Sequence, residues 1–402
     1  MRRCAAACAP PPCTRSRWER CLSDKPGRRS SVSFWAPFSL HMGARSPLGR
    51  RLHAQSLLGP TSPSFSSPPS LPPSNPSPAA VLGSNQPGAD ELAVARVMAS
   101  IADRVMVQLA SPYTFPSYHE KIEAPYDYYA FGQRYVKFLV DFSKSAVGHL
   151  ERFNAVQAAL DSGENVVLLA NHQTEADPAV WSLLLEATHP RLAKAIIHVA
   201  GDRVVTDALC APFSMGRNLF CVHSKKHMDD VPELRDAKQA INRKTVTLMI
   251  KALNEGGKLL WIAPSGGRDR PSAETGAWSP APFDPAAVEL MRQLTAKAKP
   301  AGHLYPLAME SGSMMPPPPA TEKAVGERRL TNYVGVGIAL GAKLDVEAIV
   351  AGIDEADRDA RSAAVGAAAQ KAVEGEYAGL LAAMAAGPGS WGGAYSQPWR
   401  KA

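Results

Sequence analysis

The chain has 402 residues, of which 45% are hydrophobic and 20% are charged, a composition typical of a globular protein with a sizeable core. Its formal net charge is +7, but residues 1–89 hold ten Arg and one Lys against two acidic residues. The excess positive charge therefore belongs to this first segment, and the rest of the chain is close to neutral. This distribution argues against nucleic-acid binding, which requires basic charge on the folded surface.

Residues 1–89 are also rich in Pro and Ser, with 15 of the 35 prolines of the chain. An Arg- and Ser-rich, acid-poor segment without an apolar stretch of about 7 to 15 residues is typical of an organelle transit peptide rather than a secretory signal. The sequence therefore predicts a disordered transit peptide and linker over 1–89. A disordered basic tail with no targeting role is the alternative.

The remainder of the chain contains two cysteines, Cys210 and Cys221. Two cysteines do not form a disulfide framework, and this usage fits a reducing compartment. No apolar run approaches the roughly 20 residues needed to span a bilayer. We therefore expect at most peripheral contact with a membrane.

Helical spacing of apolar residues dominates the segment that follows the leader. Apolar residues at mixed spacings of two, three and four predict a helix over 91–110. Further helical patterns cover 126–144 and 145–160, and the second of these ends at the breaker Ser162-Gly163. The sequence thus predicts a small helical N-terminal domain over residues 90–160.

From residue 161 onward, short apolar runs alternate with longer amphipathic segments. This alternation predicts an α/β domain over 161–402, with a mixed sheet covered by helices. The predicted strands are 166–170, 195–199, 219–222, 258–263, 304–309 and 333–340. The predicted helices are 178–187, 233–254, 285–298 and 357–385.

The segment Asn-His-Gln-Thr-Glu-Ala-Asp-Pro directly follows the first predicted strand of this domain. Asp177 followed by Pro178 has the form of an N-cap and a first helical residue. His172 then lies at the carboxyl end of a strand and Asp177 at the start of a helix, where open α/β sheets bind ligands. A carboxylate beside an imidazole can support general-base catalysis. A capping Asp near an unrelated loop His is the alternative.

Two basic segments follow other predicted strands. Ser-Lys-Lys-His at 224–227 comes after strand 219–222, and Ser-Gly-Gly-Arg-Asp-Arg-Pro at 265–271 comes after strand 258–263. Their cationic side chains suit a dianionic phosphate, which arginine can bind in a bidentate manner. The predicted phosphate-binding residues are Lys226, His227, Arg268 and Arg270. A solvated basic surface is the alternative.

Together these segments resemble the soluble plastidial glycerol-3-phosphate acyltransferases. The resemblance rests on NHQTEADPAV at 171–180, the stretch from GDRVVTDALC to CVHSKKHMDD at 201–230, WIAPSGGRDRP at 261–271, and LYPLAMES at 304–311. The His-x4-Asp spacing is shared by glycerolipid acyltransferases in general. Lysophosphatidate acyltransferases typically have a Glu-Gly-Thr-Arg motif where this chain has Pro-Ser-Gly-Gly-Arg at 264–268.

The resemblance implies a helical bundle before an α/β domain, and an enzyme of the plastid stroma. The implied reaction transfers an acyl group from acyl carrier protein or coenzyme A to the sn-1 hydroxyl of glycerol 3-phosphate. His172 would be the general base, Asp177 its orienting partner, and the four basic residues would bind the substrate phosphate. No cofactor or metal is expected, because His172, His223 and His227 lack a convincing ligand spacing.

Three other functions remain open on the sequence alone. An acyltransferase of the same superfamily could act on the sn-2 hydroxyl of a lysophospholipid. A non-catalytic lipid- or phosphate-binding module could keep the fold, and a phosphoesterase could use the basic residues. Acceptor specificity, thioester cleavage and phosphate release distinguish the three.

Overall fold

The computed structural model describes residues 91–225, 228–317 and 329–400. All of these belong to one compact unit, Leu71–Ala402. The predicted leader, residues 1–89, lies outside the described residues, as do Lys226 and His227 of the predicted phosphate site.

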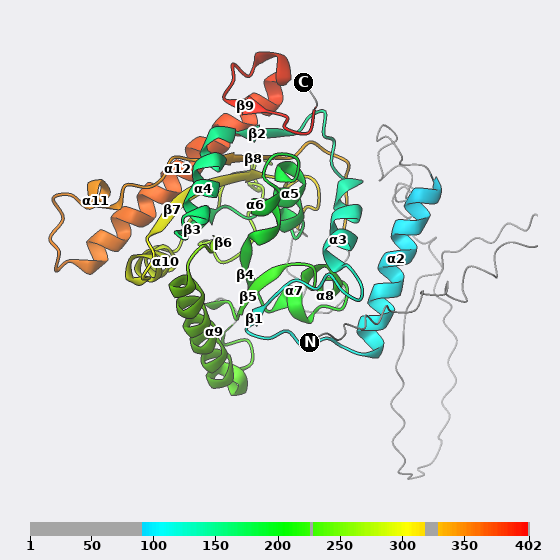
Figure 1. The fold of residues 1–402 in the computed structure, drawn as a ribbon, viewed down its shortest axis with the longest axis horizontal. Coiled ribbons are helices and arrows are strands. Elements are labelled where there is room, and N and C mark those ends of the chain that lie inside the picture. Colours follow the sequence, from blue (N-terminus) through cyan, green and yellow to red (C-terminus); the bar gives the residue numbers. More distant parts are fainter. Residues whose placement is uncertain (1–90, 226–227, 318–328, 401–402) are drawn as a thin grey trace, which may run out of the picture. The chain divides into compact units, whose positions relative to one another are not determined.

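A nine-stranded mixed sheet is the centre of the described structure, with the strand order β1-β5-β4-β6-β3-β7-β8-β2-β9 (Figure 1). The five neighbours from β5 to β7 are parallel, whereas β1–β5, β7–β8 and β2–β9 are antiparallel. The strands are β1 (Tyr118–His119), β2 (Ala146–Gly148), β3 (Asn165–Ala170), β4 (Ile197–Gly201), β5 (Asn218–Val222), β6 (Leu259–Ile262), β7 (Gly302–Glu310), β8 (Gly337–Leu340) and β9 (Tyr395–Ser396). The loops that follow the five parallel strands therefore meet at one edge of the sheet.

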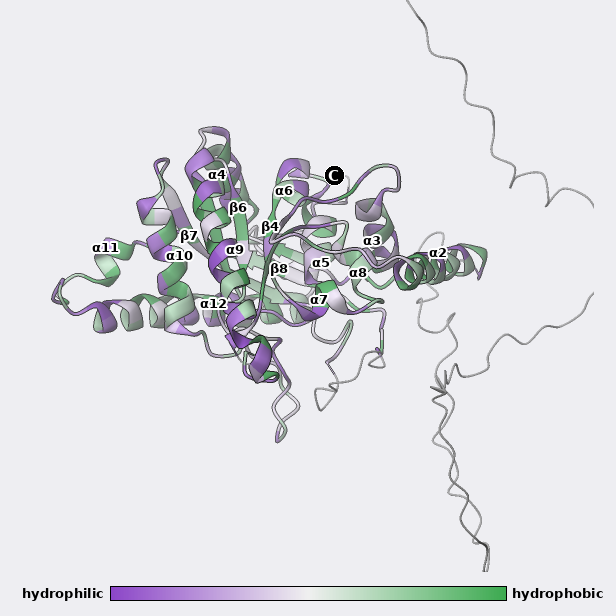
Figure 2. Cartoon of the chain, turned by 90° about the horizontal axis from the view of Figure 1, so that it is seen from below, coloured by the Kyte–Doolittle hydropathy of each residue, from purple (hydrophilic) through white to green (hydrophobic). Residues whose placement is uncertain are grey.

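Helices surround this sheet (Figure 1). They are α2 (Glu91–Ala110), α3 (Tyr128–Lys137), α4 (Leu150–Asp161), α5 (Asp177–Leu185), α6 (Pro190–Ala195), α7 (Arg203–Thr206), α8 (Ala211–Ser214), α9 (Arg235–Glu255), α10 (Pro285–Lys297), α11 (Val346–Ile349) and α12 (Arg358–Ala386). Surface helices such as α9 carry hydrophilic and hydrophobic residues side by side (Figure 2), as expected for helices that pack one face against a core. Among the described residues, none of the helices combines the length and the hydropathy needed to cross a bilayer.

The central strand β3 is buried along its whole length because both faces of the sheet are covered. Successive side chains of a strand point to opposite faces. Leu168 thus packs into the core formed with α4, α5 and α6, and Leu169 packs into the core formed with α9, α10 and α12. The continuous apolar run of β3 is typical of a parallel strand buried on both sides. This strand positions the segment that follows it.

The predicted α/β class with a mixed sheet covered by helices is confirmed. The predicted strands 166–170, 219–222, 258–263 and 304–309 correspond to β3, β5, β6 and β7, and the four predicted helices correspond to α5, α9, α10 and α12. Strand 195–199 begins two residues later than predicted, because α6 continues to Ala195. Only the second half of 333–340 forms β8.

The predicted helix over 145–160 is wrong at its start. Ala146–Gly148 forms β2, which pairs with β8 and β9, and α4 begins at Leu150 after His149 adopts a left-handed conformation with φ 58°. Pairing with strands distant in the sequence overrides the local helical pattern.

The predicted helix over 126–144 is shorter in the structure, because α3 ends at Lys137. After it, the Asp141 carboxylate accepts a hydrogen bond from the backbone N–H of Ser143 at 3.0 Å, a local turn that competes with helix. The segment 91–160 also supplies β1 and β2 to the main sheet. The helical N-terminal domain over 90–160 stays a prediction.

Candidate active site

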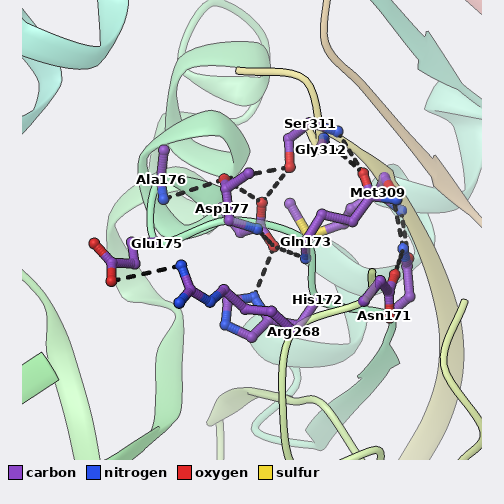
Figure 3. Close-up of polar contacts among 12 residues, drawn as sticks. Asn171, His172, Gln173, Glu175, Ala176, Asp177, Arg268, Met309, Ser311 and Gly312 are labelled. Carbon is purple, nitrogen blue, oxygen red and sulfur yellow. Dashed lines mark hydrogen bonds and ion pairs between the residues drawn. The ribbon is translucent and has the colours of Figure 1, made fainter. Parts of the chain in front are cut away.

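The site begins at the carboxyl end of β3, where the chain leaves the core and enters the His-x4-Asp segment. The Nδ1 atom of His172 lies 2.8 Å from Oδ2 of Asp177 (Figure 3). Asp177 is 1% exposed, whereas the side chain of His172 is 24% exposed. Because a carboxylate accepts, Nδ1 carries the proton, and Nε2 of His172 presents its lone pair as a base.

Four further hydrogen bonds hold the Asp177 carboxylate. It accepts from the backbone N–H groups of Gln173 at 2.8 Å and Thr174 at 3.3 Å. It also accepts from the Thr174 hydroxyl at 3.0 Å and from the Ser311 hydroxyl (Figure 3). Burial alone would raise the pKa of Asp177, but the bond and charge of His172 and these donors keep that pKa below its ordinary value. Asp177 is therefore a fixed anion beside the imidazole.

Asp177 has a different role at the helix start from the one predicted. Helix α5 begins at Asp177, and the N-cap is Ala176. The Asp177 side chain turns back onto the residues before the helix, so it does not act as the predicted N-cap. As an acid in the first helical turn it is also stabilised by the positive end of the helix dipole.

A buried network supports the turn behind His172. The amide oxygen of Gln173 accepts from the backbone N–H groups of Ser311 at 2.7 Å and Gly312 at 2.8 Å. The Gln173 amide donates to the Tyr377 hydroxyl at 3.0 Å, and this hydroxyl donates to Glu310 at 2.5 Å. Burial raises the pKa values of Glu310 and Tyr377. The end of β7 and the helix α12 thus fix the segment that carries the base.

The loop after β6 is joined to the same segment through Asp269, which is fully buried. Its carboxylate accepts from the Asn171 amide and from the backbone N–H of Ala281, both at 2.9 Å. Its own N–H donates to the carbonyl oxygen of His172 at 2.5 Å. Burial raises the pKa of Asp269 to about 6, against the opposing effect of these donors. The His-x4-Asp segment and the basic segment 265–271 are therefore neighbours in space.

Arg268 lies on this loop, and its guanidinium points toward Glu175 of the His-x4-Asp segment (Figure 3). The nearest N···O distance of the pair is 3.6 Å, and the Arg268 side chain is 18% exposed. Arg329 binds the same carboxylate more closely, with Nε 2.7 Å from Oε2, and also binds Asp207 at 3.0 Å. Burial would raise the pKa of Glu175, but Arg329 and Arg268 keep it below its ordinary value.

The structure thus brings His172, Asp177 and Arg268 together. Arg270 lies two residues further along the same loop and is exposed. Lys226 and His227 lie outside the described residues, so their part in the phosphate site stays a prediction. The strand β5 that precedes them is parallel to β4, so β5 itself ends at the edge of the sheet that carries His172.

The two cysteines of the described structure are free and buried. Burial raises the pKa of Cys221 to about 11, and burial beside Glu175 raises that of Cys210. Thiols with raised pKa values are poor nucleophiles near neutral pH. Neither environment favours attack by the thiol on a thioester.

Sequence reasoning missed most of the residues that hold the site. Ser311 lies two residues after the predicted strand 304–309, so the rule that ligand-binding loops follow strands could have found it. Glu175 is within the His-x4-Asp segment but is not part of its signature. Arg329 is 154 residues away from Glu175, and no local pattern marks it.

An imidazole held by a buried carboxylate at the carboxyl edge of an α/β sheet, next to a basic loop, can act as a general base beside an anion-binding segment. The family model described as Acyltransferase matches residues 147–310, a range that contains His172, Asp177 and Arg268. Three curated relatives are named as chloroplastic glycerol-3-phosphate acyltransferases. The protein of Spinacia oleracea is 44% identical over 324 residues, which are 80% of this chain and 68% of the relative. The proteins of Cucurbita moschata and Arabidopsis thaliana are each 47% identical over 272 residues, which are 68% of this chain and 59% of the relative.

This chain belongs to the glycerol-3-phosphate acyltransferase family of these relatives. It spans between 59% and 68% of their length.

Proposed function

We propose that the chain transfers an acyl group from a thioester to the sn-1 hydroxyl of glycerol 3-phosphate, giving 1-acylglycerol 3-phosphate. The observation that carries this proposal is the hydrogen bond between the partly exposed His172 and the buried Asp177, with Arg268 on the adjoining loop. Family membership supports the same reaction.

In the proposed mechanism, Nε2 of His172 takes the proton of the acceptor hydroxyl while that oxygen attacks the thioester carbonyl carbon. Asp177 keeps the ring in the required tautomer and stabilises the imidazolium. When the tetrahedral intermediate collapses, the C–S bond breaks and the imidazolium returns its proton to the leaving thiolate. The base starts and ends neutral, and a positioned base of this kind contributes about 10²- to 10⁴-fold in rate.

The basic residues are proposed to fix the acceptor in front of the base. Arg268 and Arg270, with Lys226 and His227, would bind the phosphate and leave the sn-1 hydroxyl near His172. Arg268 is suited to this because Arg329 forms the closer pair with Glu175, which leaves Arg268 the weaker bond to exchange for a phosphate. Orientation of this kind can contribute about 7 to 11 kcal/mol toward the barrier.

We further propose acyl carrier protein as the acyl donor, with coenzyme A thioesters also accepted, and the plastid stroma as the location. The names of the curated relatives support a plastid, and the composition of residues 1–89 supports an organelle leader. Fusing these residues to a fluorescent protein tests the location. A fusion that stays in the cytosol would contradict it.

The experiment for the reaction compares two acceptors and two donors with the purified full chain. We expect acyl transfer to glycerol 3-phosphate and little to 1-acylglycerol 3-phosphate. Transfer only to the second acceptor would instead indicate an sn-2 acyltransferase. Binding without thioester cleavage would indicate a non-catalytic module, and phosphate release without a thioester would indicate a phosphoesterase.

A further inference from the structure

A buried arginine lies away from the proposed phosphate site, at the start of β5. Arg217 is 8% exposed and donates to the Ser182 hydroxyl at 3.1 Å and to the Gln133 amide oxygen at 2.5 Å. Both acceptors are neutral, and within the described part of the chain Arg217 forms no ion pair with a carboxylate. A buried charge without a counter-charge is costly unless something compensates it.

A small pocket lies against this guanidinium. Tyr129, Lys194, His198 and Arg217 are among the residues that line it. The Tyr129 hydroxyl is buried without a hydrogen-bond partner, and so is Nδ1 of His198. The Tyr129 ring lies 5.1 Å from the Arg217 guanidinium carbon and 5.1 Å from the Lys194 ammonium. The pocket therefore offers a buried hydroxyl, with Ser182 as its near neighbour, next to two cations.

The charges around the pocket do not balance. Lys121, which also lines it, binds Glu123, and Lys194 shares that same carboxylate at 3.6 Å. Burial and the nearby Arg217 lower the pKa of His198 to about 3, so its ring is neutral at physiological pH. Glu186 acts on Arg217 only at longer range. Lys121 and Lys194 are partly exposed to solvent, so the buried Arg217 is the charge of the pocket that lacks a close counter-charge.

We propose that this pocket binds a small monatomic anion of the halide class, of which chloride is the common member. The space available to a particle the size of water is about 10 Å³, which is room for about one such particle. Chloride is somewhat larger than a water molecule, and sulfate and phosphate are larger still. A water molecule could satisfy the Tyr129 hydroxyl and His198, but it would leave the charge of Arg217 uncompensated.

The pocket is distinct from the proposed active site but close to it. His198 is in the first half of β4, and Trp261 packs beside it on the same face of the sheet, with ring centroids 5.6 Å apart. Trp261 also packs against His172, with ring centroids 5.4 Å apart. One indole ring therefore separates the proposed anion pocket from the proposed base, and the inference does not depend on the acyltransferase activity.

Thermal unfolding of the full chain at constant ionic strength tests the proposal, with chloride replacing gluconate. We expect the midpoint to rise with chloride, because a ligand that binds only the native state stabilises it. For a site half-filled at about 10 mM, 100 mM chloride shifts the unfolding equilibrium about elevenfold. Sulfate at the same ionic strength should not raise the unfolding midpoint as chloride does. Bromide in crystals should give an anomalous peak beside Arg217.

Two variants locate the effect. Tyr129→Phe keeps the ring and removes the unpartnered hydroxyl, so the half-saturating chloride concentration should rise about three- to tenfold, the equivalent of one hydrogen bond. Arg217→Gln should abolish the chloride effect; if this variant does not fold, Tyr129→Phe still decides. Tyr126→Phe is the matched control, because its hydroxyl bonds with Ser100 instead. A response that is absent, or equal in all variants, would show an ordered water only and overturn the proposal.

Discussion

The backbone N–H of Asp269 donates to the carbonyl oxygen of His172 across an N···O distance of 2.5 Å. Asp269 is the residue between Arg268 and Arg270, so this bond ties the proposed phosphate loop directly to the residue that carries the proposed base. In the proposed mechanism, this backbone contact helps to set the distance between the substrate phosphate and the imidazole. Mutations should therefore be able to affect the positioning of the acceptor and the transfer of its proton separately.

Replacing His172 with Ala removes the base but none of the predicted phosphate ligands. We expect turnover to fall by about 10²- to 10⁴-fold, with the affinity for glycerol 3-phosphate nearly unchanged. Steady-state kinetics and calorimetric titration of the acceptor measure the two effects. Near-normal turnover would rule out His172 as the base.

Replacing Ser311 with Ala removes one donor to the buried Asp177 carboxylate. The loss of one such bond to a charged group, about 1.5 to 3 kcal/mol, should lower kcat roughly 10- to 150-fold and leave KM for glycerol 3-phosphate unchanged, because Ser311 does not bind the acceptor in the proposed mechanism. Ser313→Ala is the control, since Ser313 is exposed on the same loop. A higher KM with unchanged kcat would argue against this positioning role.

Replacing Arg268 with Ser removes a proposed phosphate ligand. The binding of glycerol 3-phosphate should weaken by about 1.5 to 3 kcal/mol, the contribution of a hydrogen bond to a charged group. This corresponds to a roughly 10- to 150-fold higher Kd. Arg243→Ser, at an exposed position on α9, controls for the loss of one positive charge. An unchanged Kd would place the phosphate elsewhere.

Replacing Asp269 with Asn should change how stability depends on pH. The folded-state pKa of Asp269 is raised from 3.8 to about 6. Between pH 4 and 6 the folded protein therefore holds a proton that the unfolded chain has lost, so this group makes stability fall as pH rises through that window. Above pH 6 the loss of stability caused by this group reaches about 3 kcal/mol. The Asp269→Asn variant has no titrating group at this position, so it lacks this loss.

Denaturant unfolding of both proteins from pH 4 to 7 measures this difference. The free energy of unfolding of Asp269→Asn minus that of the unaltered protein should increase with pH up to about pH 6. The charge of Asp269 is one cause of the raised pKa of Glu310, so the pH dependence of this difference also includes a contribution from Glu310. A difference that is constant with pH would show that burial does not perturb Asp269.

The pairing of His172 with Asp177 could be predicted because both residues lie in one short connection after a strand that is apolar throughout. The order of strand and helix brings them together, and no distant contact is needed. Ser311 is 134 residues from Asp177, so its contact depends on β7 lying beside β3. Sequence patterns place each strand but do not determine which strands become neighbours.

The same limitation explains the error at 146–148. These residues continue a helical pattern in the sequence, and they form a strand because β8 and β9 are available on either side. Arg329 and Tyr377 were missed for a related reason. Each reaches the site from a segment that has no catalytic motif of its own.

The unequal sharing of Glu175 suggests how acceptor binding could be retuned. One arginine holds this carboxylate closely and the other holds it at 3.6 Å, so the acid competes with any incoming anion for the looser partner. A weaker contact between Arg329 and Glu175 would strengthen the pairing of Glu175 with Arg268. The affinity for phosphorylated acceptors would then fall, without a change in any residue proposed to contact them. Acceptor affinity could then be adjusted in a graded way from a position outside the binding surface.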